Sequence, residues 1–422
     1  MTTTYGRKRA QRRWFAVAVS ALATATVLTA CSGSDSGSAS AGGPSPIVIG
    51  VMAPVGTPQV DFGGIFAAVK ASAAVVNKQG GINGRPIEVF TCNTQYQANQ
   101  ELACARQAVA KHAVAMVGNN NALVGTAMER ILAQAHIADI ANVGPLTSNY
   151  QGDNTFPLTW EIGSFFPCAS KELAQKVNAD SVVMVQSPVN VLDTIASMIG
   201  NGARTNGLRA LPPIVTADNV SDYSPYVAQA QQSGAKIVVL GLLGSGPQAF
   251  VRASSAAGAK YTICTALGLT GSGGWADLGA ATNQLYVGAT FRPLSEAGSL
   301  PLLKTMLDSM AAEEATGDKY ANTSPQVFQA QSMGAWLGVQ AFAQVAKTIP
   351  GDVTAESFLP AITKAKVNLG DIIQDIDFTK ARSAGDYQRV YNSDAYLWKW
   401  DSPSSQYHLE GSVKDTLDMA VG

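Results

Sequence analysis

The feature that most constrains the fold is a repeated alternation of short apolar runs with longer helical patterns. Four apolar runs come early in the chain, at 47–53, 87–90, 113–118 and 137–141. Between them lie Ala-rich stretches whose apolar residues recur at helical spacing, the first of which runs from Phe62 to Val76. Short apolar strands joined by helices are typical of a parallel sheet that is covered on both faces. The sequence therefore predicts an α/β protein built from right-handed crossovers.

A second alternation of the same kind follows. Apolar runs at 181–186, 237–243 and 261–264 predict strands, and helices are expected near 167–178, 190–205, 223–232 and 247–257. The two halves thus share a layout that favours two similar α/β lobes. The segment 152–167 between them is irregular and rich in aromatic residues, which is typical of a crossover.

The last third of the chain is less regular. A long helix is expected over 325–347, where an apolar stripe is better explained by core packing than by a cofactor site. Two short strand patterns, AYLWKW and QYHLEG, follow near the C-terminus and are separated by an Asp-Ser-Pro turn.

The N-terminal residues form a targeting segment rather than part of the fold. A basic stretch, GRKRAQRRW, precedes an apolar stretch of about 14 residues, which is too short for an ordinary membrane span. The next residues, LTAC, resemble the lipobox of bacterial lipoproteins, in which the cysteine is diacylated and becomes the mature N-terminus. We therefore expect a signal peptide over 1–30, a lipid on Cys31 and a flexible tether over 31–46. The alternatives are an ordinary secretory signal or an anchor helix, and RRWF at 12–15 also allows twin-Arg export.

Loss of the signal peptide leaves an acidic chain. The sequence holds 29 Lys and Arg against 30 Asp and Glu, and five of the basic residues precede Cys31. The mature chain therefore carries 24 basic and 30 acidic residues, a net charge of about −6 with neutral His. Because nucleic-acid binding needs clustered Lys and Arg, no nucleic-acid partner is expected.

Four cysteines remain beyond Cys31. An even number in an oxidising compartment favours disulfides, for which three pairings exist; four buried free thiols are the alternative. Cys92 would end a strand and Cys104 would lie in the next helix, so we favour the pairs Cys92–Cys104 and Cys168–Cys264. No Cys-x-x-Cys occurs and the three histidines are scattered, so no metal site is predicted.

One segment is more specific than the rest. The stretch AAVVNKQGGINGRPIEVF at 73–90 has the pattern of a helix end, a Gly80-Gly81 stop, an Asn83-Gly84 turn and a strand. It also resembles the N-x-x-GGI-x-G-R signature of the branched-chain amino-acid-binding (Leu/Ile/Val-binding-protein-like) family of ABC-importer solute receptors. The similarity extends to MVGNNNALVGTAMERILAQAHIADIANVGP and to DNVSDYSPYVAQAQQSGAKIVVLG, and it covers roughly 47–400.

The resemblance implies a type I periplasmic-binding-protein fold, in which two parallel-sheet α/β lobes are joined by a hinge with several crossovers. The N-terminal lobe would be discontinuous, over 47–160 and 290–380. The C-terminal lobe would take 161–289 and 381–422. A solute would bind between the lobes, which agrees with the tendency of open parallel sheets to bind ligands at the carboxyl ends of their strands.

The resemblance also indicates a binding site. In that family a Ser or Thr and backbone amides after the third strand typically hold the solute's carboxylate, because a helix N-terminus favours an anion. Asn121-Ala122 take that place here, and a second family hydroxyl falls on Pro145, for which Thr147 or Ser148 could substitute. The ligand-binding residues expected from the resemblance are Phe62, Asn119, Asn120, Asn121, Ala122, Val143, Gly144, Thr147, Val191 and Leu267.

Some of these positions depart from the family pattern. An acidic partner for an α-ammonium is expected after YTIC, where Leu267 stands instead. Because an ammonium buried without a carboxylate is costly, a free α-amino acid is disfavoured, and a neutral or carboxylate-bearing, largely apolar solute is favoured. If the true alignment is shifted by a few residues, the missing charge could come from one of four acids: Glu161, Asp193, Asp218 or Asp277.

Structural roles compete with several of these assignments. Phe62 begins the apolar stripe of a helix and could belong to the core. Asn119 and Asn120 could do no more than shape the turn between a strand and a helix. The aromatic residues of 152–167 are expected to pack at the hinge in preference to stacking on a ligand.

Together these observations predict an extracytoplasmic solute-binding lipoprotein. It would capture an amino-acid-like solute, an amide or an apolar carboxylate and deliver it to an ABC permease. We expect a monomer without a cofactor, anchored to the cell membrane by its N-terminal lipid. The alternative is a ligand-sensing protein that feeds a separate signalling partner. No G-x-S-x-G, H-E-x-x-H or similar catalytic motif appears, so an enzyme is not expected.

Overall fold

The computed structural model describes residues 45–57, 60–269, 274–324, 330–381 and 385–421. The predicted signal peptide, Cys31 and most of the predicted tether lie outside the described residues. At the end of that tether, the carbonyl oxygens of Ser45 and Pro46 accept hydrogen bonds from the Arg85 guanidinium, at 2.8 and 3.3 Å. Within the described ranges, no helix has both the length and the apolar character needed to cross a membrane.

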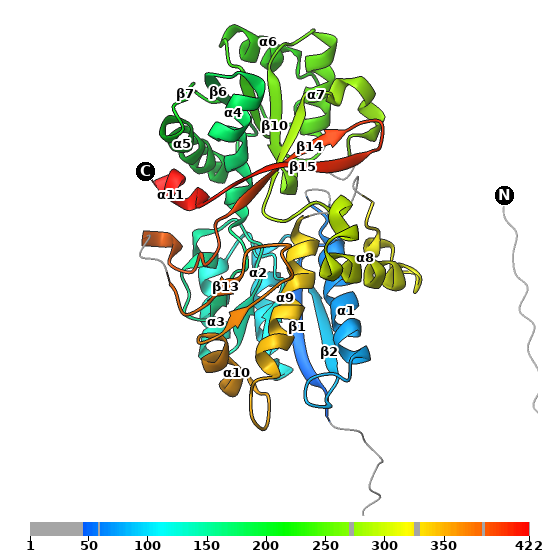
Figure 1. Ribbon diagram of the computed structural model, residues 1–422. Helices are drawn as coiled ribbons and strands as arrows, with labels where there is room; N and C mark the ends of the chain where they lie inside the picture. Colours follow the sequence, from blue (N-terminus) through cyan, green and yellow to red (C-terminus); the bar gives the residue numbers. More distant parts are fainter. Residues whose placement is uncertain (1–44, 58–59, 270–273, 325–329, 382–384, 422) are drawn as a thin grey trace, which may run out of the picture. The chain divides into compact units, whose positions relative to one another are not determined.

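The first alternation of strands and helices forms a five-stranded parallel sheet in the order β2-β1-β3-β4-β5 (Figure 1). Its strands are β1 Ile47–Ala53, β2 Ile87–Asn93, β3 Ala115–Val117, β4 Ala138–Ile140 and β5 Thr155–Phe156. The helices between them are α1 Gly63–Lys78, α2 Ala98–Ala110 and α3 Gly125–Gln134. Strands β3 and β4 are fully buried, as expected for apolar runs covered on both faces.

The second alternation forms an eight-stranded sheet in the order β15-β14-β11-β10-β9-β6-β7, with β8 also paired to β6. The strands are β6 Ser181–Gln186, β7 Arg209–Ala210, β8 Ile214–Val215, β9 Ile237–Gly241, β10 Thr262–Ala266, β11 Leu285–Ala289, β14 Ala395–Asp401 and β15 Gln406–Val413. The two C-terminal strands add to β11 in antiparallel fashion, whereas the other neighbours are parallel.

The helices of this second region are α4 Lys171–Val177, α5 Asn190–Thr205, α6 Ser224–Gln232, α7 Gly246–Ala256 and α11 Thr416–Val421. Helix α6 begins one residue after the start of its predicted range of 223–232, and Tyr223 occupies the N-cap position. Asp222 still accepts a hydrogen bond from the Ser224 amide at 2.9 Å, and Pro225 lies in the first turn.

The chain then returns to the region of the first sheet, where it forms three later helices: α8 Pro301–Glu314, α9 Ala330–Ala346 and α10 Ala355–Ile362. Helix α9 runs alongside α1 (Figure 1) and is almost entirely buried. The Ser72 hydroxyl of α1 donates to the Trp336 carbonyl of α9 at 2.8 Å and accepts from the Gln340 side chain at 2.9 Å. The predicted stripe is therefore core, as expected, and the predicted residues 325–329 of this helix lie outside the described ranges.

The chain changes sheet after β5, after β11 and again before β14. The first of these passages is the predicted crossover, and it contains the 3₁₀ helix η2 Glu161–Ala169. A small antiparallel pair, β12 Lys366–Val367 with β13 Ile376–Asp377, precedes the last passage. The exact lobe boundaries stay a prediction.

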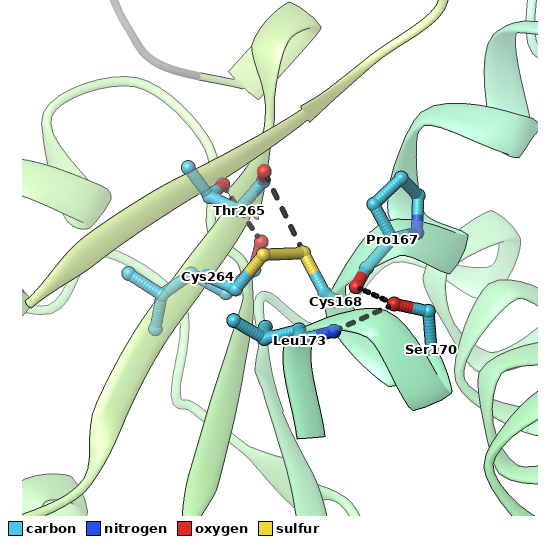
Figure 2. Close-up of a disulfide and its surroundings, with 7 residues drawn as sticks. Pro167, Cys168, Ser170, Leu173, Cys264 and Thr265 are labelled. Atoms are coloured by element: carbon cyan, nitrogen blue, oxygen red, sulfur yellow. Dashed lines mark hydrogen bonds between the residues drawn. A yellow bond between two sulfur atoms is a disulfide. The ribbon is translucent and has the colours of Figure 1, made fainter. Parts of the chain in front are cut away.

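Both favoured disulfides are present in the structure. Cys92–Cys104 joins β2 to α2, and Cys168–Cys264 joins η2 to β10, an internal strand of the eight-stranded sheet (Figure 2). Beside the second disulfide, the Ser170 hydroxyl donates to the Pro167 carbonyl at 2.7 Å and accepts from the Leu173 amide at 3.2 Å. Covalent and capping contacts thus fix the first crossover to the sheet.

Candidate functional site

A cavity of about 440 Å³ lies where strands of both sheets end. Its walls come from segments that follow β1, β2, β3 and β4 of the first sheet and β6, β9 and β10 of the second. Residues of η2 and of α9 complete it. Because open parallel sheets bind ligands beyond the carboxyl ends of their strands, this cavity is the strongest candidate for a functional site.

The lining is mostly apolar. The aliphatic and aromatic side chains of Val60, Phe62, Val143, Ile162, Phe165, Val189, Val191, Leu192, Ile195, Leu243 and Leu269 contribute to it. Two carboxylates, Asp61 and Glu161, are the only charged side chains that the described part of the chain places in the lining. No Lys, Arg or His lines the cavity among these residues.

Five of the predicted ligand-binding residues line the cavity: Phe62, Asn120, Ala122, Val143 and Val191. Pro145, which stands where the family's second hydroxyl would fall, lines it as well. The other five predicted residues, which are Asn119, Asn121, Gly144, Thr147 and Leu267, lie outside the described lining.

The three asparagines after β3 have different surroundings. Asn119 is fully buried; its side chain accepts from the Met52 amide at 3.0 Å and donates to Asp139 at 2.8 Å. Asn120 faces the cavity and donates to the Val143 carbonyl at 3.2 Å, which links the loops after β3 and β4. Asn121 is fully buried against the loop of Gly144. The loop therefore combines a structural residue with a cavity-facing one.

Gly144 and Thr147 have structural surroundings too. A Cβ atom on Gly144 would lie 2.0 Å from the Asn149 side-chain nitrogen and 2.5 Å from the Asn121 carbonyl oxygen, so only glycine fits there. Thr147 begins the 3₁₀ helix η1 Thr147–Tyr150, and its side chain is hydrogen-bonded to that of Tyr387.

Leu267 directly follows β10 but is buried in a small separate recess. The residues after it, Gly268 and Leu269, are the ones that reach the cavity. The structure thus places the two residues after Leu267, and not Leu267 itself, in the wall of the cavity.

The sequence pattern led us to expect an acidic residue at the position of Leu267, and the structure places the acid Glu161 in the cavity wall instead. Glu161 begins η2, lines the cavity and accepts a hydrogen bond from the Gln331 side chain of α9 at 3.1 Å. Its own amide donates to the Tyr150 hydroxyl oxygen at 3.2 Å, which holds its backbone. Loss of hydration raises the pKa of the Glu161 carboxyl to about 7, because no cation among the described residues compensates for the burial.

The other three candidate acids lie elsewhere. Asp193 accepts a hydrogen bond from the Gln186 side chain at 2.6 Å, and Asp218 and Asp277 are exposed. None of the three lines the cavity. Of the four acids considered from the sequence, only Glu161 is placed to meet a solute.

Glu101 is a residue that the sequence prediction missed. It lies in α2, is 1% exposed, and accepts hydrogen bonds from three successive backbone amides: Ala122 at 3.1 Å, Leu123 at 3.3 Å and Val124 at 3.0 Å. These amides lead into α3 and belong to the place where the resemblance puts the solute's carboxylate. The signal was an acidic residue three positions before buried Cys104, on the same helix face.

A buried acid pair lies beneath the same loop. Glu129 and Asp139 are hydrogen-bonded to each other, while Asn154 donates to Glu129 at 3.2 Å and Asn142 donates to Asp139 at 3.1 Å. Burial raises the pKa of Asp139 to about 6, and burial together with the neighbouring Asp139 raises the pKa of Glu129 well above its usual range.

The sequence profile of the family described as "Periplasmic binding protein" matches residues 46–404, which is most of the chain. The chain belongs to the periplasmic binding protein family. This confirms the family predicted from the sequence motifs. It also agrees with the position of the cavity at the strand ends of two α/β sheets.

Solved structures share the fold at low sequence identity. The chain is similar to the leucine-, isoleucine-, valine-, threonine- and alanine-binding protein from Brucella ovis, with 17% identity, a TM-score of 0.69, and 89% of this chain and 97% of that chain covered. A solute-binding protein from R. palustris in complex with 4-hydroxybenzoate gives 14% identity, a TM-score of 0.69, and coverage of 88% and 98%.

A third similar structure is a fatty acid ABC transporter substrate-binding protein from Thermomonospora curvata, with 13% identity, a TM-score of 0.67, and coverage of 89% and 95%. Identities this low establish the shared fold and no more. The predicted type I periplasmic-binding-protein fold is therefore confirmed. A search of curated proteins finds no match to this chain.

Proposed function

We propose that the chain is an extracytoplasmic solute receptor that binds one small molecule between its two sheets and delivers it to an ABC importer. The observation that carries this proposal is the cavity of about 440 Å³ at the strand ends of both sheets. Its volume falls within the range of roughly 300–1,000 Å³ that is usual for small-molecule sites, and its largely apolar lining with a few polar groups is typical of such sites.

The solute would be amino-acid-like, an amide or an apolar carboxylate. The similar structures are named for branched-chain and other amino acids, for 4-hydroxybenzoate and for fatty acids, all of which are small and partly apolar. Of the residues predicted to bind it, we assign the direct contacts to Phe62, Asn120, Ala122, Val143 and Val191, which line the cavity.

The membrane attachment is part of the proposal. The signal peptide over 1–30 would be removed, and lipid on Cys31 together with the tether over 31–46 would hold the domain at the outer face of the membrane, as a monomer close to its permease. Two disulfides support an oxidising compartment outside the cytoplasm. Replacing Cys31 with Ala should move the protein from the membrane fraction to the soluble fraction, and retention in the membrane would contradict the lipid anchor.

A thermal-shift screen of the purified protein against a metabolite library tests the binding role. At least one small solute should raise the melting temperature in a concentration-dependent way, since a ligand that binds only the folded state stabilises it. Val191→Arg places a long cation in the cavity and should abolish the shift. Val215→Arg, at an exposed valine of β8 outside the cavity, should leave the shift intact.

Failure of the whole library to stabilise the protein would overturn the binding role. The family consists of binding proteins, and we propose no catalytic activity. Neighbouring genes for a permease and an ATPase would support import, whereas a neighbouring sensor kinase would support the sensory alternative.

A further inference from the structure

We infer that the solute presents an amine or amide N–H group to the Glu161 carboxylate from an otherwise apolar body, and that it carries no carboxylate. This inference rests on the proposed function, because it names the class of solute for the same cavity. Of the three solute classes of the previous section it keeps the amides, removes the amino-acid-like solutes and the apolar carboxylates because both carry a carboxylate, and adds the amines. Three independent observations support it.

The first observation is that the expected anion site is already filled. Glu101 binds the amides of Ala122, Leu123 and Val124 with both carboxylate oxygens. A solute carboxylate would have to displace Glu101 from these donors or lie beside it. Displacement would leave a buried, unpaired charge, and close approach of two like charges away from bulk water is repulsive. The loop that would accept an anion in a carboxylate-binding relative is therefore closed to one here.

The second observation is the sign of the charge in the lining. Its charged side chains among the described residues are Asp61 and Glu161, and no basic side chain balances them. Asp61 is exposed at the rim and already accepts hydrogen bonds from the amides of Gly56 and Gly63, at 3.0 and 3.2 Å. A carboxylate solute would meet acids and no base, whereas an ammonium or an amide N–H would meet an acceptor.

The third observation is that Glu161 is held in place yet incompletely paired. Gln331 is the only donor to its carboxylate that the described residues provide. The side-chain amide oxygen of Gln331 is buried and has no partner among the described residues, so this residue brings no further donor to the carboxylate. A partly buried carboxylate with one donor gains stability from any further donor that a solute brings.

The surroundings of the Glu161–Gln331 pair fix its position. Glu161 begins η2, which the Cys168–Cys264 disulfide ties to β10. Gly268, just after β10, lies directly against the pair: a Cβ atom there would come within 2.7 Å of a Glu161 carboxylate oxygen and 2.9 Å of the Gln331 side-chain nitrogen. The geometry is that of a preorganised acceptor, built from three separate elements of the chain.

Matched probes test the inference. Calorimetry would compare trios that share one apolar skeleton and differ in the head group: 3-methylbutylamine, 3-methylbutanamide and 3-methylbutanoate, and the corresponding phenylethyl and phenylacetyl trio. The trios would be tested alongside the metabolite library. For every skeleton that binds, the amine or the amide should bind at least tenfold more tightly than the carboxylate. A carboxylate that binds within tenfold of both donors, or more tightly, would overturn the inference.

Variants separate recognition from fold. At pH 8, above the Glu161 pKa of about 7, Glu161→Gln keeps the shape but removes the charge, so it should weaken the binding of the best amine at least tenfold and reduce the preference over the carboxylate. Gly268→Ala should weaken the same probe by displacing the pair, without altering Glu161 itself. Glu314→Gln, at an exposed glutamate of α8 outside the cavity, should bind as the wild type does. Wild-type affinity for the amine in both cavity variants would overturn the inference.

The two proposals fail in different ways. If no trio and no library compound binds the wild-type protein, the proposed function fails, and the inference fails with it. If library compounds bind but the tight ligands are carboxylates, the receptor role stands and the inference alone is wrong.

Discussion

Glu101 and Glu161 are both acidic residues withdrawn from solvent near the same cavity, yet their surroundings differ. Glu101 receives three backbone amides of its own chain. Glu161 receives one side-chain amide and faces the cavity. The difference shows that burial alone does not mark a carboxylate as a binding residue. What marks it is a place in a cavity wall together with too few donors from the protein.

The two acids also lie on elements that are covalently fixed. Cys104 ties α2, which carries Glu101, to β2, while Cys168 ties η2, which carries Glu161, to β10. A carboxylate that must stay in one place, whether to hold a loop or to meet a solute, benefits from such a rigid support. Variants that remove the disulfides, the two acids or the asparagines near the cavity test this difference between Glu101 and Glu161.

The largest effect is expected from the disulfides. The Cys168–Cys264 bond closes a separation of 96 residues and Cys92–Cys104 one of 12. On the chain-entropy account their removal as Cys→Ala pairs should cost about 4–5 and about 3 kcal/mol of unfolding free energy, respectively. Urea denaturation of both double variants measures the two losses of unfolding free energy and shows which is larger. Equal losses, or a larger loss from the short loop, would contradict it.

Removing Glu101 should come next. Glu101→Ala leaves three partly buried amides without an acceptor, and the expected loss is about 3 kcal/mol. Glu101→Gln keeps an acceptor but loses the charge, so we expect a loss of about 1–2 kcal/mol. Chemical denaturation at pH 7 provides the measurement. A Glu101→Ala protein as stable as the wild type would show that the loop does not depend on this carboxylate.

Glu161 should respond with the opposite sign. Its folded-state pKa of about 7 lies above the ordinary value of 4.5, so the folded state holds the proton more firmly than the unfolded state. The stability contributed by that proton is complete below pH 4.5 and is lost as the pH rises to about 7. Glu161→Gln should therefore stabilise the solute-free protein by about 3 kcal/mol at pH 8 and by little at pH 4.5.

Thermal and urea unfolding across this pH range would check the prediction. The free energy of unfolding of the Glu161→Gln variant should still fall as the pH rises, because Asp139 and Glu129 also have raised pKa values. A variant that is less stable than the wild type at pH 8 would mean that Glu161 has a protein partner in solution.

The smallest effect is expected at Asn120. Among the described residues its side chain hydrogen-bonds only to the Val143 carbonyl, at 3.2 Å. This bond lies at the cavity wall, where water can replace it, so Asn120→Ala should cost about 1 kcal/mol or less. Asn119→Ala should cost more, because Asn119 joins the Met52 amide to Asp139 inside the protein. Equal losses would remove the distinction between a cavity-facing and a structural asparagine.

Much of the fold was predictable from the sequence because its signals are local. The apolar runs became β1 to β4 and β6, β9 and β10, and the Gly80-Gly81 stop and Asn83-Gly84 turn have the positive φ angles that such residues allow. The disulfide pairs followed from the same element assignment. In each case the residues whose pattern made the prediction are the same residues that form the predicted strand, turn or disulfide.

The site was only partly predictable because its contacts are not local. The amides that bind Glu101 lie 21 to 23 residues further along the chain, and nothing in the sequence of α2 announces them. Glu161 faces the cavity only because η2 turns at a crossover, and its Gln331 partner is 170 residues away. Leu267 lies in a separate recess while Gly268 and Leu269 reach the cavity, and an alignment to a family pattern does not distinguish such neighbours.

A crystal structure of the protein with a bound solute would test the assignment of Glu161 most directly. We expect an amine or amide nitrogen of the solute within hydrogen-bonding distance of the Glu161 carboxylate, with Glu101 still bound to the amides of Ala122 to Val124. A solute carboxylate on those amides, with Glu101 displaced, would contradict it.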